Sequence, residues 1–283
     1  MSDKSLPIGV FDSGVGGLTV VKEILHTLPN EKIVYFGDTA RVPYGNKSPE
    51  IIIRYSKQIT KFLVSQNVKA ITIACNTASA LALEAVRAEV SIPVLGVVEP
   101  GARAAARATT GGRIGVIGTT ATIASGLYEK YINIFSPDAK VFSAACPLLV
   151  NLVEEGLIED PVTVQMIHRY LDELIRINSI DTLILGCTHY PLLMPVIARE
   201  IRAYKANAAA GEPDKITLID PAFETAHALK ALLEESNLCT DSVVASNPDS
   251  HRYFVSDDAE RFRTFADEIL GIRTDNVSTL VLK

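Results

Sequence analysis

The most regular feature of the chain is a series of short apolar runs in which hydrophobic and polar residues do not alternate. The runs are rich in Ile, Val and Leu, and longer stretches with helical periodicity lie between them. Strands of this kind are usually buried on both faces, as they are in parallel sheets covered by helices. The predicted strands are residues 8–11, 33–36, 70–74, 94–98, 114–117, 141–144, 182–185 and 216–219. The clearest predicted helices are residues 18–28, 50–66, 79–89 and 162–178.

This alternation of strands and helices predicts an α/β fold with mainly parallel sheets covered by helices. Near the C-terminus, residues 253–256 predict a further strand. Ser256 and the two aspartates after it predict the start of a helix, because acidic side chains suit the positive end of the helix dipole. Gly271 predicts the end of that helix.

The chain also contains an internal echo. Residues 8–14 (IGVFDSG) resemble 114–120 (IGVIGTT), residues 70–77 (AITIACNT) resemble 182–189 (TLILGCTH), and residues 97–100 (VVEP) resemble 218–221 (LIDP). Cys187 follows Cys75 by 112 residues and Gly115 follows Gly9 by 106, which suits two duplicated domains. We expect a first domain formed by residues 1–98 and 213–283, and a second formed by residues 99–212. Residues 97–100 and 218–221 each precede an alanine-rich stretch that predicts a helix.

Composition narrows the class of protein. The chain has 283 residues, of which 48% are hydrophobic and 21% charged, as expected for a globular protein. No run approaches the length of a membrane span, and the N-terminal segment lacks the apolar stretch of a signal peptide, so we expect a cytoplasmic protein. Four cysteines are too few for a disulfide framework. The net charge of −6, without a run of consecutive basic residues, argues against nucleic acid or membrane as the main partner.

Two cysteines occupy matching positions in the two halves. Cys75 and Cys187 each follow an apolar strand and precede small polar residues and a helix. Ligands of such sheets bind at the carboxyl ends of the strands, and a helix N-terminus favours a thiolate. A cysteine at a strand end can also be a small core residue, but two in matching places favour a chemical role. Cys146 and Cys239 share neither context, and we interpret both as structural.

Residues next to these cysteines could bind a carboxylate. Asn76, Thr77 and Thr188 offer neutral donors at helix starts, where carboxylates are readily bound. Ser13 begins a glycine-rich turn, residues 13–17, with backbone N–H groups. The turn lacks the lysine of a Walker motif and the last glycine of GxGxxG. It could equally be a turn that only needs glycine conformations.

Asp12 and His189 are the candidate proton-handling groups, because each lies beside the glycine-rich turn or a cysteine. An aspartate after a strand can instead cap a helix, and a histidine can be structural, so both interpretations stay open. Cys187 and His189 could suggest zinc, but the spacing is not a standard ligand pair and no third or fourth ligand is evident. We therefore predict no metal.

Four motifs together resemble the glutamate racemase family over nearly the whole chain. They are residues 9–18 (GVFDSGVGGL), 35–45 (YFGDTARVPYG), 74–79 (ACNTAS) and 186–191 (GCTHYP). The resemblance implies two α/β domains that face each other across a buried site and work without pyridoxal phosphate, metal or nucleotide. It also implies a homodimer and a bacterial role in supplying D-glutamate for peptidoglycan synthesis.

The resemblance further implies a role for each site residue. Cys75 and Cys187 would be the paired acid and base, with Cys75 meeting D-glutamate and Cys187 meeting L-glutamate. The implied substrate-binding residues are Asp12, Ser13, Tyr44, Gly45, Asn76, Thr77, Thr188 and His189. The implied auxiliary groups around the thiols are Asp12, Asp38, Glu154 and His189. The match at residues 154–157 (EEGL) is short, so Glu155 could take the place of Glu154.

Other functions remain open from the sequence. A related enzyme of the same fold could act on aspartate or hydantoins, or could be a decarboxylase. A protein that binds a ligand between its domains without chemistry belongs to a different class. A partner of DNA topoisomerase, as reported for some glutamate racemases, is a third alternative, which the acidic balance of the chain neither supports nor excludes.

Overall fold

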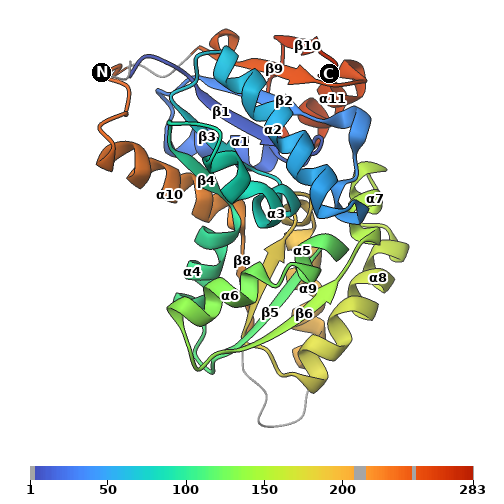
Figure 1. Ribbon diagram of the computed structural model, residues 1–283. Coiled ribbons are helices and arrows are strands. Elements are labelled where there is room, and N and C mark those ends of the chain that lie inside the picture. The colour runs from blue at the N-terminus through green and yellow to red at the C-terminus, as the bar shows by residue number, and fades with distance from the viewer. Residues whose placement is uncertain (1–3, 207–214, 244–246, 283) are drawn as a thin grey trace. The chain divides into compact units, whose positions relative to one another are not determined.

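The computed structural model describes residues 4–206, 215–243 and 247–282, and it consists of two compact units (Figure 1). The first unit comprises Met1–Val97 with Ala222–Lys283, and the second comprises Val98–Pro221. Each unit contains a sheet in which all the paired strands are parallel. The predicted α/β fold with helix-covered parallel sheets is therefore confirmed.

The strands of the first unit are β1 (Ile8–Asp12), β2 (Ile33–Gly37), β3 (Ala70–Ile73), β4 (Val94–Gly96), β9 (Arg252–Val255) and β10 (Val277–Thr279). Those of the second unit are β5 (Arg113–Gly118), β6 (Lys140–Ala145), β7 (Thr182–Gly186) and β8 (Thr217–Ile219). β4 ends earlier than predicted, because Val98 already belongs to a helix. The pattern did not predict β10, which is short and mostly exposed.

The internal echo corresponds to a repeated strand order. The first sheet runs β10-β9-β2-β1-β3-β4 and the second runs β6-β5-β7-β8. From β2 onward the first sheet runs β2-β1-β3-β4, and the second runs β6-β5-β7-β8. In both sheets the second strand along the chain is followed by the first, the third and the fourth. β5 therefore corresponds to β1, and β7 to β3. Cys75 and Cys187 follow the corresponding strands β3 and β7.

One part of the predicted domain division is wrong. The sequence placed residues 213–220 in the first domain, but β8 pairs in parallel with β7 of the second sheet, with Thr217 opposite Thr182. Residue 213 lies outside the described residues, and the first unit resumes at Ala222. The reason is topological: β8 is the fourth strand of the repeat, as β4 is in the first unit.

Helices cover both faces of the first sheet. The helices of this unit are α1 (Leu18–Thr27), α2 (Pro49–Ser65), α3 (Asn76–Arg87), α10 (Pro221–Glu235), which begins at the boundary between the units, and α11 (Ala259–Phe265). On one face, Phe11, Phe36 and Ile73 form a core with residues of α2 and α3 such as Ile59 and Ala82.

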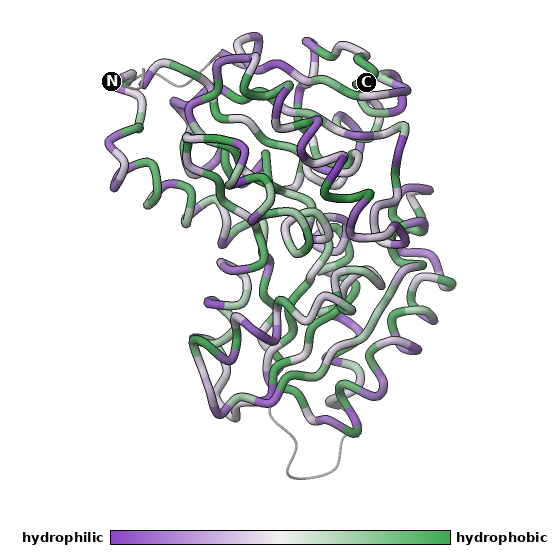
Figure 2. The backbone as a smooth tube through the Cα atoms, in the orientation of Figure 1, coloured by the Kyte–Doolittle hydropathy of each residue, from purple (hydrophilic) through white to green (hydrophobic). Residues whose placement is uncertain are grey.

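The side chains that alternate with these along the strands point to the other face of the sheet, where they pack against α11. The ring centroid of Tyr35 on β2 lies 5.7 Å from that of Phe262 on α11. β1, β2 and β3 are buried along their whole length, as expected for strands covered on both sides. Figure 2 shows hydrophobic colouring along these strands, whereas α2 alternates between hydrophobic and hydrophilic stretches.

The second unit is built in the same way. Its helices are α4 (Val98–Ala108), α5 (Thr120–Ala124), α6 (Leu127–Phe135), α7 (Leu148–Glu154), α8 (Pro161–Asp172) and α9 (Met194–Ala206). The predicted helix 162–178 is present as α8 continued by a π-helical turn, Glu173–Ile177. Proline at the first position of α8 and the side chain of Asp160, which accepts a hydrogen bond from Val162 N, explain where this helix begins.

The C-terminal segment returns to the first sheet. β9 pairs with β2, with Tyr253 opposite Tyr35. Asp258 caps α11 through its side chain, which accepts a hydrogen bond from Arg261 N. The predicted stop at Gly271 is confirmed, because this residue has φ +62°, a left-handed conformation that favours glycine. Among the described residues, no helix is both long and apolar enough to cross a membrane.

Candidate functional site

The predicted site residues of the first unit follow the carboxyl ends of three adjacent strands. Asp12 ends β1, Asp38 follows β2, and Cys75 lies two residues after β3. Parallel strands end at the same edge of a sheet, so their turns converge there. The turns and the helix start that follow carry the other predicted residues of this unit, Ser13, Tyr44, Gly45, Asn76 and Thr77.

Strand register places a hydroxyl beside the first thiol. Phe11 on β1 is paired with Ile73 on β3, so the same offset sets Ser13 opposite Cys75. The Cys75 thiol donates a hydrogen bond to Ser13 Oγ at 3.7 Å. Both side chains are buried, with 8% of Ser13 and 4% of Cys75 exposed.

Cys75 is also the N-cap of α3. Its Sγ accepts a hydrogen bond from Ala78 N at 3.4 Å, in the position that a serine or aspartate side chain usually takes. The free N–H groups and the dipole of the helix favour negative charge at this point. Asn76 and Thr77 form the first turn of the same helix and are buried. The amino end of α3 therefore combines a thiol with donors that suit a carboxylate.

Asp12 is completely buried and accepts a hydrogen bond from Gly14 N at 2.9 Å. Tyr35 donates to Gly14 O at 2.6 Å. The glycine-rich turn has no left-handed residue; Gly17 is required for space, because a Cβ there would lie 2.4 Å from Asp12 Cβ. Asp12 thus stabilises its own turn. Burial, then the negative charges of Asp12 and Cys75, raise the pKa of Tyr35 well above its usual value.

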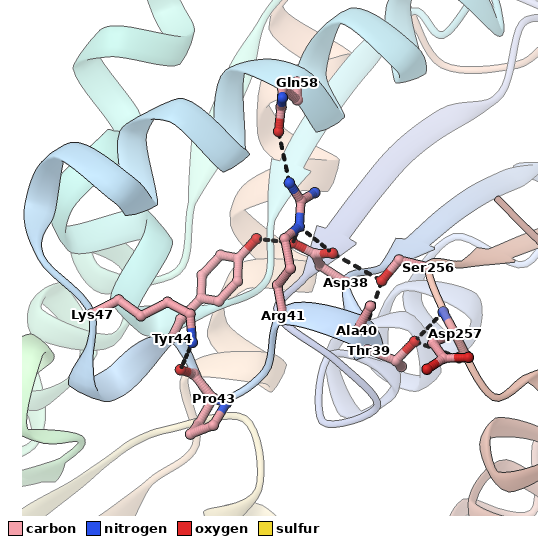
Figure 3. Close-up of polar contacts among 10 residues, drawn as sticks. All are labelled: Asp38, Thr39, Ala40, Arg41, Pro43, Tyr44, Lys47, Gln58, Ser256 and Asp257. Carbon is pink, nitrogen blue, oxygen red and sulfur yellow. Dashed lines mark hydrogen bonds and ion pairs between the residues drawn. The ribbon is translucent and has the colours of Figure 1, made fainter. Parts of the chain in front are cut away.

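Asp38 forms a hydrogen-bonded cluster with residues of its own turn and of the C-terminal segment (Figure 3). The Tyr44 hydroxyl donates a short hydrogen bond to Asp38 Oδ2. Burial, followed by the charge of Asp38 and this hydrogen bond, raises the pKa of Tyr44 far above its usual value. Asp38 and Tyr44 are fully or almost fully buried, whereas Gly45 is partly exposed.

The second unit presents the corresponding edge. Cys187, Thr188 and His189 follow β7 directly, and all three are buried. His189 Nδ1 lies 3.8 Å from Cys187 Sγ, and His189 Nε2 lies 3.0 Å from Glu154 Oε1 at the end of α7. The imidazole therefore bridges a thiol and a carboxylate.

This bridge holds a proton on His189. Burial by itself would lower the pKa of His189, but the hydrogen bonds with Cys187 and Glu154 and the charges of both outweigh it and raise the pKa to about 10. Nδ1 and Nε2 both donate when the ring is protonated, which suits a sulfur on one side and a carboxylate on the other. Cys187 therefore has a protonated imidazole beside it in the neutral pH range.

The structure settles which glutamate faces His189. Glu154 makes the contact, whereas Glu155 is the C-cap residue of α7.

Thr119 is a residue of this edge that the sequence pattern did not single out. Gly118 is paired with Gly186, so the register sets Thr119 opposite Cys187, as Ser13 is opposite Cys75. The echo between residues 8–14 and 114–120 was the signal for this residue.

Tyr190 is a second overlooked residue. Its hydroxyl donates to Cys146 O at 2.8 Å and its N–H donates to Cys187 O at 3.0 Å, so it holds the turn after the thiol.

Cys146 is completely buried, and burial raises the pKa of its thiol well above the usual value. Burial also raises the pKa of Cys239. All four cysteines are free. Within the described part of the chain, no three His, Cys, Asp or Glu side chains group as a metal site requires.

Comparison with known proteins gives consistent matches. Residues 8–229 match the Asp/Glu/Hydantoin racemase family. A glutamate racemase of Geobacter metallireducens is 48% identical over 276 residues, which cover 98% of this chain and 97% of that protein. The crystal structure of glutamate racemase RacE1 from Bacillus anthracis superposes with a TM-score of 0.90 at 40% identity, covering 99% of both chains.

A Francisella tularensis glutamate racemase solved in complex with D-glutamate superposes with a TM-score of 0.87 at 37% identity, again covering 99% of both chains.

Because His189 bridges Cys187 and Glu154, replacing it in a His189→Asn variant should change the reactivity of Cys187 but not that of Cys75. Cys187 should react with iodoacetamide at neutral pH between about 10-fold and 10³-fold more slowly, because unit charges about 4 Å apart interact by about 4 kcal/mol at an effective dielectric constant of about 20. Mass spectrometry of the alkylated peptides measures each cysteine separately. Cys75, which belongs to the other unit, serves as the internal control. An unchanged rate at Cys187 would contradict the charge assignment.

Proposed function

The chain belongs to the Asp/Glu/Hydantoin racemase family, and we propose that it is a glutamate racemase in which two thiols move the proton on Cα. The observation that supports this most directly is the repeated placement of a thiol after the third strand of each sheet: Cys75 contacts the hydroxyl of Ser13, and the register of the second sheet sets Thr119 at the same position relative to Cys187. Inversion of a carbon centre needs a base on one face and an acid on the opposite face. Two similar units can each supply one thiol.

In this proposal Cys187 removes the proton from L-glutamate and Cys75 removes it from D-glutamate. In each direction the other thiol delivers a proton to the opposite face of the substrate. The substrate is held by side chains and N–H groups at the carboxyl ends of the strands. These substrate-binding residues are Asp12, Ser13, Tyr44, Gly45, Asn76, Thr77, Thr188 and His189.

A thiolate alone does not account for such a reaction. The Cα–H group of an amino acid is a far weaker acid than a thiol, whose ordinary pKa is about 8.5. Preorganised donors on the α-carboxylate must therefore stabilise the negative charge that develops in the transition state. Asn76 and Thr77 at the start of α3 suit this role in the first unit, and Thr188 suits it in the second. Excluding water would strengthen these contacts.

The two thiols receive different electrostatic support. Cys187 lies beside Nδ1 of the protonated His189. On the other side of the ring, Nε2 donates a hydrogen bond to Glu154. Cys75 instead accepts a backbone N–H at the amino end of α3, with Asp12 buried in the neighbouring turn. His189, Glu154 and Asp12 are thus the auxiliary groups of the proposal.

The proposal includes a biological setting. Complexes of related enzymes, such as the D-glutamate complex from Francisella tularensis, support a small-molecule substrate. The enzyme would act in the cytoplasm as a homodimer and would supply D-glutamate for peptidoglycan synthesis. Activity on aspartate or hydantoins, ligand binding without chemistry, and a role with DNA topoisomerase are the alternatives against which the following experiments test it.

The first prediction is that no cofactor takes part. The residues proposed to act on Cα are thiols, hydroxyls, an imidazole and carboxylates, which can move protons without a metal or pyridoxal phosphate. Purified protein should racemise glutamate after exhaustive chelation and should show no pyridoxal absorbance. Loss of activity on chelation that added metal restores would contradict this prediction.

The second prediction tests the two-thiol geometry by exchange in heavy water. A resting thiol carries deuterium there, so one thiol removes protium from the substrate while the other delivers deuterium. Early product of either handedness should carry deuterium at Cα, while recovered substrate should stay largely protiated. Mass spectrometry of the separated enantiomers measures both. A single base that swings between faces would instead return much of the original hydrogen to the product.

Matched cysteine variants complete this test. Cys75→Ala and Cys187→Ala should each abolish racemisation, because either change removes one of two indispensable partners. Cys146→Ala and Cys239→Ala are the controls and should act only through stability, measured by thermal unfolding. If early product retains its original hydrogen, or if Cys75 or Cys187 proves dispensable, the two-base proposal fails.

The third prediction concerns the substrate. The polar groups proposed to bind carboxylates come from several turns and helix starts in both units, and this spread suits the longer diacid. Aspartate should leave some of them unpaired and should be turned over roughly 10⁴-fold less efficiently, the scale typical of lost buried hydrogen bonds. Comparing kcat/KM for glutamate and aspartate measures the ratio. Comparable values would overturn the assignment to glutamate.

A further inference from the structure

Asp38 is a buried carboxylate whose two oxygens are both engaged by protein groups (Figure 3). Arg41 Nε lies 2.9 Å from Oδ1 and 2.7 Å from Oδ2. Ser256 Oγ donates to Oδ1 at 2.9 Å, and the Tyr44 hydroxyl donates to Oδ2. A carboxylate compensated in this way by a cation and two hydroxyls is suited to holding its neighbours in place.

Two of these neighbours are themselves fixed by further contacts. The Arg41 guanidinium lies 4.0 Å from the ring centroid of Tyr55 and donates to Gln58 Oε1 at 2.7 Å. The ring centroid of Tyr44 lies 5.9 Å from that of Tyr55. Tyr55 and Gln58 belong to α2, so the cluster is anchored to a helix that packs on the sheet.

Ser256 brings the C-terminal segment into the same cluster. It follows β9 directly, is buried, and its N–H donates to Gly37 O at 3.0 Å. Its hydroxyl accepts a hydrogen bond from Ala40 N at 2.8 Å and donates to Asp38. The hydroxyl thus joins two parts of the chain that are 218 residues apart in sequence.

Tyr44 connects this cluster to the proposed substrate site. It begins the short helical turn Tyr44–Asn46, which includes Gly45, and its ring is 1% exposed. A buried side chain held at its hydroxyl end restricts the backbone that carries it. The position of the Tyr44–Gly45 segment therefore depends on where Asp38 holds the phenol.

We infer that Asp38, Arg41 and Ser256 are positioning residues, which act through Tyr44 to hold the Tyr44–Gly45 segment in place for glutamate. Asp38 does not exchange protons with the substrate in this arrangement, because its oxygens are committed to Arg41, Tyr44 and Ser256. This differs from the role beside the thiols that the family resemblance implies for Asp38. The inference rests on the proposed racemase function.

Thr39 provides a matched control for Ser256. The Thr39 hydroxyl donates to Asp257 O at 2.5 Å and accepts from Asp257 N at 2.8 Å. It therefore links the same two segments through one donated and one accepted hydrogen bond, as the Ser256 hydroxyl does, but both of its hydrogen bonds go to Asp257 and not to the Asp38 carboxylate (Figure 3). Ser256→Ala and Thr39→Val each remove one such link.

Steady-state kinetics of these variants test the inference. Ser256→Ala should raise KM for glutamate in both directions roughly tenfold or more, the scale of one lost hydrogen bond to a charged group, with a much smaller change in kcat. Thr39→Val should keep the KM of the wild type. Asp38→Asn should also act mainly on KM and should leave the shape of the kcat–pH profile unchanged.

A double-mutant cycle supplies a readout that a purely structural role would not move. Ser256→Ala should add little to the KM of a Tyr44→Phe variant, because the route through the phenol is already broken, whereas Thr39→Val should behave additively. Thermal unfolding of each variant separates folding from binding. A lower Tm with unchanged KM in Ser256→Ala, additivity with Tyr44→Phe, or an altered kcat–pH profile in Asp38→Asn would each overturn the inference.

The outcomes also separate this inference from the function on which it rests. If the wild type does not racemise glutamate, the proposed function fails and the inference fails with it. If the wild type is active and Ser256→Ala behaves like Thr39→Val, the inference alone is wrong.

Discussion

The parallel register between the first and third strands of each sheet is the constraint on which the candidate site depends. In the first sheet it brings Ser13 opposite Cys75, and in the second it brings Thr119 opposite Cys187. Successive residues of a strand point to opposite faces, so a slip of one residue would turn the hydroxyl away from the thiol. In the second sheet the first and third strands, β5 and β7, approach closely: a Cβ at Gly186 would lie 2.6 Å from Ile117 O.

Burial around the two thiols limits which groups can exchange protons. Burial is the largest cause that raises the pKa of Tyr35, Tyr44, Tyr128 and Tyr190, so these phenols stay protonated in the neutral range. His189 differs from these phenols, because its contacts with a thiol and a carboxylate overcome the cost of burying its charge. The same fold thus provides neutral hydrogen-bond donors in most places and one cation beside Cys187.

The two units repeat an architecture without repeating its electrostatics. Asp12 ends β1, and the corresponding residue at the end of β5 is Gly118. The acidic group of the second unit comes instead from Glu154 at the end of α7 and reaches the thiol through an imidazole. The Asp38 cluster also depends on β9, which pairs with β2, and the described strands of the second sheet include no counterpart of β9. A racemase that binds two enantiomers therefore need not place identical groups around each of them.

By itself the sequence predicted the described strands other than β10, and it identified two cysteines at matching positions in the two halves. Unbroken apolar runs are local signals of buried parallel strands, and the echo around Cys75 and Cys187 needed only comparison of short segments. Asn76 and Thr77 could be recognised for the same reason, since a helix start after a strand is a local event. Thr188, which was expected at a helix start, instead lies in the turn before the short helix Tyr190–Leu193.

Only the tertiary structure decided the contacts that join distant segments. It assigned β8 to the second sheet, chose Glu154 over Glu155 as the partner of His189, and placed Ser256 on Asp38. Such choices depend on which strands pair and on the direction in which a helix end presents its side chains. Local propensity carries no information about either, because the pairing of remote segments is decided by the packing of the whole unit.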